Sequence, residues 1–159
     1  MSAPSAARTR AAAFSDQWRH TMEHAVHDPP GTALGPRLAA DVVAMVREAR
    51  ITLDYSPASL TLVDRVIGGI RRENPPVGAV SRTLLGLGAY TGEVLVRAAG
   101  AEWVDFDPAE QDIFGQPFGI RTSDGRLWNP LGRALRRYEN GPDDSLRLFY
   151  LSVTGEAAV

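Results

Sequence analysis

The sequence from Arg126 to Ser145 reads RLWNPLGRALRRYENGPDDS, and it decides more about the fold than any other part of the chain. Asn129 can accept hydrogen bonds from the free N–H groups that open a helix, and Pro130 suits the first helical position. Asn140-Gly141-Pro142 is a strong helix stop, and residues 143–145 can open another element. The stretch therefore predicts the end of a strand, a capped helix and the start of a further element, and it contains no catalytic signature.

The helix of this stretch is expected over residues 130–138. Its apolar positions should be buried, namely Leu131, Ala134, Leu135 and Tyr138. Its arginines should point outward, namely Arg133, Arg136 and Arg137. Apolar residues at helical spacing also predict a short helix over 146–153.

Upstream of this helix the pattern is extended. Residues 102–106, 118–122 and 126–128 are rich in aromatic and β-branched side chains and predict three strands. Ser123-Asp124-Gly125 separates the last two strands, and Asp-Gly is a hairpin signal. A small antiparallel meander is therefore expected before the C-terminal helices.

Four further helices are predicted from apolar periodicity, over residues 14–26, 36–50, 56–73 and 79–99. The last of these is apolar nearly all round, which indicates a central element, and its Gly88 and Gly92 indicate that another backbone packs closely on one face. Residues 1–13 lack periodicity and predict a disordered tail, and residues 154–159 predict a flexible C-terminus. We expect one α+β domain over residues 14–153: about four helices, a three-stranded antiparallel meander, and one or two C-terminal helices that cover it.

The amino-acid composition excludes several classes of function. The chain has 159 residues, of which 44% are apolar, and this is enough for one domain with a hydrophobic core. It has no cysteine, which excludes disulfides and thiol catalysis, and all 17 basic residues are arginine, which excludes a lysine nucleophile. A net charge of −2 argues against nucleic-acid binding over the whole surface, and no apolar run is long enough for a membrane span.

His20, His24 and His27 are the only histidines, and they would share one side of the helix over 14–26. Imidazoles one turn apart can share a metal ion. Three ligands on one helix, however, extend along about 10 Å of its axis, so at most two could bind one ion without help from a second segment. We expect no metal site, with these histidines as the candidates if one exists.

Tyr90, Glu93 and Arg97 form a second cluster on the apolar helix over 79–99. Glu93 precedes Arg97 by four residues, the favourable order for a helical ion pair. A buried glutamate without a partner could instead serve as a general acid or base, which makes Glu93 the one catalytic candidate. We favour the structural ion pair.

A third cluster combines arginines with an aromatic residue over the hairpin and the following helix: Arg121, Arg126, Arg133, Arg136, Arg137 and Trp128. Such a group could contact phosphates and bases. Acidic residues lie directly before and after it in the sequence, so an ion-paired surface or a protein-docking face fits the pattern better.

Several segments together resemble an uncharacterised family of bacterial domains of unknown function, of the type found in high-GC actinobacterial genomes. They are Gly88-Ala89-Tyr90-Thr91-Gly92-Glu93, then Glu102-Trp103-Val104, Asn129-Pro130, and Glu139-Asn140-Gly141-Pro142-Asp143-Asp144-Ser145-Leu146 with Phe149-Tyr150. The resemblance covers about residues 53–153. It implies an α+β domain and no known activity, so no catalytic residue follows from it.

These patterns favour a cytoplasmic, non-enzymatic protein-interaction module that acts as an adaptor, a regulator or an immunity-like partner. We expect a protein partner, no cofactor, no nucleic acid and no membrane. The alternative is a hydrolase or metal-binding enzyme that uses Glu93 or the histidines His20, His24 and His27.

Overall fold

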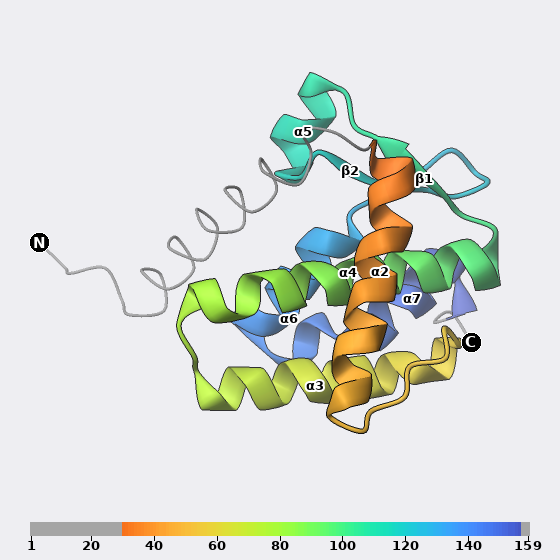
Figure 1. Cartoon of the computed structure of the whole chain (residues 1–159). Helices are drawn as coiled ribbons and strands as arrows, with labels where there is room; N and C mark the ends of the chain where they lie inside the picture. The colour runs from red at the N-terminus through yellow and green to blue at the C-terminus, as the bar shows by residue number, and fades with distance from the viewer. Residues whose placement is uncertain (1–29, 157–159) are drawn as a thin grey trace, which may run out of the picture.

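The computed structural model describes residues 30–156 (Figure 1). Its elements in chain order are α2 (Gly31–Glu48), the 3₁₀ turn η1 (Pro57–Ser59), α3 (Leu60–Glu73), α4 (Val77–Ala99), β1 (Glu102–Asp105), α5 (Pro108–Phe114), β2 (Phe118–Arg121), β3 (Leu127–Trp128), α6 (Pro130–Asn140), the 3₁₀ turn η2 (Pro142–Asp144) and α7 (Leu146–Thr154). The predicted α+β class is confirmed in these residues. The predicted tail over 1–13 and helix over 14–26, with its three histidines, lie outside them.

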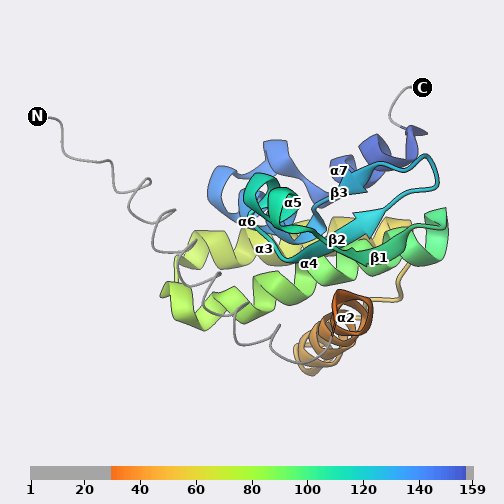
Figure 2. The same ribbon diagram turned by 90° about the horizontal axis from the view of Figure 1, so that it is seen from above.

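Helix α4 is the centre of the domain. In Figure 1 α2 crosses α4 and α3 runs beside it, and Figure 2 shows α6 and α7 on the side of α4 away from α2. Every residue from Leu84 to Leu95 is buried. The apolar sequence around the whole of this helix therefore reflects packing on all sides, as predicted.

The three strands form one antiparallel sheet in the order β1-β2-β3, which confirms the predicted meander. Trp103 in β1 lies opposite Ile120 in β2, and Ile120 lies opposite Trp128 in β3. The turn between β2 and β3 is closed by a hydrogen bond from Thr122 N to the Arg126 carbonyl, and Gly125 has a φ of 84°. The Asp-Gly signal thus marks the turn because glycine adopts this left-handed conformation readily.

Helix α2 begins at Gly31, whereas the sequence predicted a start near Pro36. A carboxylate from another element explains the difference, because Asp105 Oδ1, at the end of β1, accepts a hydrogen bond from Gly31 N at 2.8 Å. Pro36 then lies inside the helix. Its missing N–H removes one bond of the ladder near the N-terminus, a loss that the packing of α2 on α4 and β1 offsets.

Helix α5 was not predicted from the sequence, although its first turn carries a clear signal. Asp107 accepts from the backbone N–H of Glu110, and the Glu110 side chain accepts in return from Asp107 N. Pro108 occupies the first helical position. This capping box holds a short helix that buries none of its residues, so apolar periodicity could not reveal it.

Helix α6 has the predicted cap and most of the predicted burial. Asn129 Oδ1 accepts from Gly132 N at 2.9 Å, and Leu131, Ala134 and Tyr138 are buried. Leu135 is only partly buried. The expectation that Arg137 points outward was wrong, because this arginine is 6% exposed and pairs with a carboxylate of α3.

The close packing predicted for two glycines of α4 is present at both, with different neighbours. A Cβ on Gly88 would lie 2.7 Å from Leu131 Cα, so the backbone of α6 packs directly on this position. A Cβ on Gly92 would instead collide with the indole ring of Trp103. The second contact is therefore with a side chain and not with a backbone.

Candidate functional site

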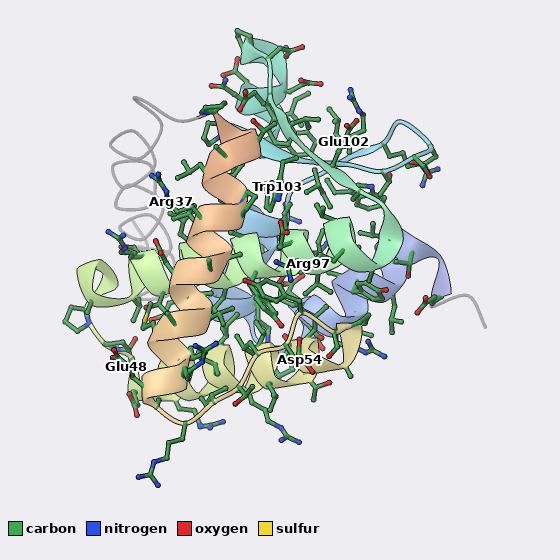
Figure 3. The ribbon with its side chains drawn as sticks, turned by 45° about the vertical axis from the view of Figure 1, so that its right-hand side comes forward. Arg37, Glu48, Asp54, Arg97, Glu102 and Trp103 are labelled. Atoms are coloured by element: carbon green, nitrogen blue, oxygen red, sulfur yellow. The ribbon has the colours of Figure 1, made fainter. Side chains whose placement is uncertain are left out.

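Glu93 is a buried carboxylate whose two oxygens both have partners. Oε1 accepts a hydrogen bond from Arg97 Nε at 3.2 Å, and Oε2 accepts one from Trp103 Nε1 at 2.9 Å. Glu93 is 8% exposed, whereas the side chain of Arg97 is 53% exposed. Figure 3 shows Arg97 and Trp103 beside the crossing of α2 and α4. The predicted ion pair is present, and it holds Glu93 in the fold.

The indole of Trp103 is held in a narrow slot between two helices. A Cβ on Gly35 of α2 would lie 2.5 Å from the ring, and Gly92 of α4 lies against the ring as well. The ring also meets Phe118 edge-on, with centroids 5.8 Å apart. The ring therefore has little room to move, and its hydrogen bond to Glu93 is held in one geometry. This favours a structural role for the carboxylate.

Tyr55 lies next to this cluster and has a left-handed backbone, with a φ of 63°. The Tyr90 hydroxyl accepts from Tyr55 N at 2.8 Å and shares a hydrogen bond of 2.6 Å with Ser59 Oγ. The guanidinium of Arg97 lies 3.6 Å from the centroid of the Tyr55 ring. Burial raises the pKa of both tyrosines, so both hydroxyls stay protonated near neutral pH and act as hydrogen-bonding groups.

A second charged network joins α3 to the C-terminal elements. Asp64 accepts from Ser145 Oγ at 2.7 Å, from Leu146 N at 2.8 Å and from Arg147 N at 3.2 Å, so it caps α7 from a distant helix. Arg137 Nε lies 3.4 Å from Asp64 Oδ1, and Arg137 Nη2 donates to the Asp64 carbonyl at 3.0 Å. Arg137 is therefore a buried partner of Asp64 and does not contribute to the predicted interaction face.

Two other arginines of the predicted face, both on the hairpin, form ion pairs with carboxylates. Arg121 pairs with Glu102 at 2.6 Å across neighbouring strands. Arg126 pairs with Asp124 at 3.7 Å within the turn. Both pairs are well exposed, and exposed pairs of this kind contribute little to stability.

The remaining members of the predicted face meet at a hollow of about 170 Å³ between α5, β3, α6 and α7. These elements lie on the side of α4 opposite α2 (Figure 2). The residues around the hollow are Ile113, Phe114, Leu127, Trp128, Asn129, Gly132, Arg133, Arg136 and Phe149. This lining contains five apolar or aromatic side chains, two cations and no carboxylate. We call these nine residues the hollow face.

The two arginines of the hollow face differ in their surroundings. Arg133 pairs with Asp144 at 3.2 Å and lies 5.1 Å from the centroid of the Phe149 ring, and burial lowers its pKa. Arg136 is exposed and has no ion pair within 4 Å among residues 30–156. Its positive charge acts on Glu139. Burial raises the pKa of Glu139, and the charge of Arg136 offsets part of that rise. Arg136 is thus the cation of this face that can accept a new anionic partner.

Part of the hollow face was therefore predicted from the sequence. The predicted cluster included Trp128, Arg133 and Arg136, which the structure brings together. It did not include the apolar residues supplied by α5, β3 and α7, which are Ile113, Phe114, Leu127 and Phe149. The capping box at Asp107 could have predicted α5, but no local pattern indicates that α5 lies beside α6.

No group of three or more His, Asp or Glu side chains within residues 30–156 is arranged to hold a metal ion. The candidate ligands His20, His24 and His27 fall outside this range, so the structure does not test them. Among the helices of the same range, none combines the length and the apolar character that a membrane crossing requires.

Comparisons with models of known protein families, with curated proteins and with solved structures found no significant match to this chain. The resemblance to a bacterial family of unknown function therefore stays a prediction.

Proposed function

We propose that this chain is a non-enzymatic protein-interaction module, of the adaptor, regulator or immunity-like kind, that binds a partner protein through the hollow face. The observation that carries the proposal is the hollow itself, with exposed Ile113 and Arg136 beside the partly buried Trp128. Ile113 is 78% exposed. Tryptophan and arginine are enriched among residues that dominate binding energy, and they act most strongly where a pocket receives a partner side chain.

The charged residues elsewhere support the same assignment. Glu93 is bound to Arg97 and Trp103, and Asp64 is bound to Arg137 and the N-terminus of α7, so both carboxylates have structural partners. A general base needs an oxygen that can reach a substrate proton. The alternative of a hydrolase based on Glu93 has no such support from its surroundings.

Affinity capture from extracts of the source cells tests the proposal. The parent chain should retain a partner protein that Ile113→Gln loses, because the substitution removes an exposed apolar contact without disturbing buried residues. Met45→Gln is the matched control, since Met45 is 40% exposed and lies on α2, on the opposite side of α4. The purified partner must then bind the purified parent directly. Equal capture by the parent and Ile113→Gln would contradict the proposal.

A further inference from the structure

We infer that the hollow face binds a protein segment in which one bulky apolar side chain enters the hollow and a nearby carboxylate pairs with Arg136. This inference rests on the proposed function and specifies the chemistry of the partner segment.

The volume of the hollow sets the size of the apolar group. A cavity of about 150 Å³ holds a benzene molecule. The hollow of about 170 Å³ therefore suits one aromatic or branched aliphatic side chain. Trp128 and Phe149 already meet edge-on with centroids 6.2 Å apart, so an entering ring or branched chain would meet aromatic walls.

The walls of the hollow are held in place before any partner arrives. The Asn129 amide donates to the Phe114 carbonyl at 2.9 Å, which joins the end of α5 to the start of α6. The Trp128 indole donates to Thr122 Oγ1 at 3.0 Å, which fixes the ring against the hairpin. Binding to a preformed site of this kind loses less conformational entropy than binding to a mobile one.

The charges of the lining set the polar part of the ligand. Arg133 is already paired with Asp144, whereas exposed Arg136 has no ion pair within 4 Å in residues 30–156. An aspartate or glutamate close to the bulky apolar residue of the bound segment would form an ion pair with Arg136. A guanidinium can bind a carboxylate through two parallel hydrogen bonds. Exposed Asp112 lies next to Ile113 in the chain and would disfavour a second acidic residue on that side, so the carboxylate should approach from the α6 side.

A protein segment fits these features better than a nucleic acid does. Nucleic-acid binding requires several cations that neutralise several phosphates. Here Arg121, Arg126 and Arg137 are paired with carboxylates, and the whole chain carries a net charge of −2.

A displayed library of random peptides of about a dozen residues, selected on the immobilised full chain, tests the inference. Selected peptides should share a bulky apolar residue and an aspartate or glutamate within a few positions of it. Fluorescence anisotropy then measures the affinity of one labelled peptide and of its counterpart with the acid changed to the amide. Protein variants are Arg136→Gln and Ile113→Gln, with Arg37→Gln and Met45→Gln as controls on α2.

Changing the peptide acid to its amide and Arg136→Gln should each weaken binding about fivefold to tenfold, and the two together should weaken it hardly more than either alone. The controls should match the parent. If Ile113→Gln weakens binding but the acid and Arg136 make no difference, the inference about the carboxylate is wrong while the docking face stands.

If no selected peptide depends on Ile113, or if the library yields no binder, the inference is overturned together with its docking site. Binding of a single-stranded oligonucleotide that Arg136→Gln weakens would also overturn it, in favour of a nucleic-acid ligand.

Discussion

The carboxylate of Glu93 shows how much of a single contact local sequence can predict. Arg97 lies four residues later on the same helix, so the spacing alone indicates that partner. Trp103 lies on β1 and reaches Glu93 only because α4 ends at Ala99 and the chain turns back at Gly100. The second hydrogen bond depends on this turn and on the slot between Gly35 and Gly92, which no periodicity encodes.

Removing Arg97 should destabilise the protein more than neutralising Glu93. Arg97→Ala leaves Glu93 with Trp103 alone and removes the contact with Tyr55, at an expected loss of about 1–2 kcal/mol in the free energy of unfolding. The loss stays below that of a fully buried pair because the Arg97 side chain is 53% exposed. Glu93→Gln keeps an acceptor for Trp103 and should lose less than about 1 kcal/mol. Urea unfolding measures the free energy of unfolding of both variants, with Arg65→Ala as the control. An Arg97→Ala variant as stable as the parent would show that the pair does not stabilise the fold.

Glu139 should make stability depend on pH. Burial raises the pKa of Glu139 in the folded chain above its ordinary value of 4.5, which holds in the unfolded chain. At pH values between the unfolded-state pKa and the folded-state pKa, the folded chain therefore binds more protons than the unfolded chain. The contribution of Glu139 to the free energy of unfolding therefore falls as pH rises through that window. Glu139→Gln should be more stable than the parent at about pH 7, and the difference should shrink at about pH 4. Thermal unfolding at both pH values checks this, and a variant less stable than the parent at neutral pH would contradict it.

At the scale of elements, the packing of α4 can be tested at three glycines. Gly88→Ala and Gly92→Ala should each lose about 1–3 kcal/mol, because the added methyl group would meet Leu131 and Trp103 respectively. Gly78 lies in the first turn of the same helix, and a methyl group added there would meet no atom within 4 Å, so Gly78→Ala should gain up to about 1 kcal/mol. Chemical denaturation of the three variants gives the comparison. Equal stability of all three would show that α4 is not packed as described.

The position of α7 depends on a side chain of α3. Asp64→Ala should lose about 3–5 kcal/mol, because it removes the cap of α7 and leaves the Arg137 side chain, 8% exposed, without its carboxylate. Asp112→Ala on α5 is the control, since Asp112 is exposed. Hydrogen exchange of the α7 amides should accelerate in Asp64→Ala alone. Unchanged exchange would mean that Asp64 does not hold α7.

Elements with strong local signals could be predicted from the sequence, and elements defined by distant contacts could not. The caps at Asn129 and Ser145 and the turn at Gly125 lie where the sequence indicates, because each depends on neighbouring residues. The start of α2 was placed too late, since its cap is Asp105, far along the chain. Arg137 was placed outside for the same reason, because its partner Asp64 belongs to another helix.

At the scale of the whole molecule, the hollow face exists only because four elements converge. Trp128, Arg133 and Arg136 are close in sequence and could be grouped in advance. Ile113 and Phe149 come from α5 and α7, whose places beside α6 are set by the Asn129 bond to Phe114 and by the cap from Asp64. The arginines of the hairpin, Arg121 and Arg126, lie outside this hollow and pair with acidic neighbours.

Photo-crosslinking in the source cells tests most directly whether the hollow face is the docking site. A photoreactive benzoylphenylalanine replaces Ile113 in one version of the full chain and Arg37 on α2 in another. We predict a discrete crosslinked protein from position 113, with a lower yield when Arg136→Gln is added, and none from position 37. Crosslinking at position 37 with none at position 113 would contradict the proposed docking site.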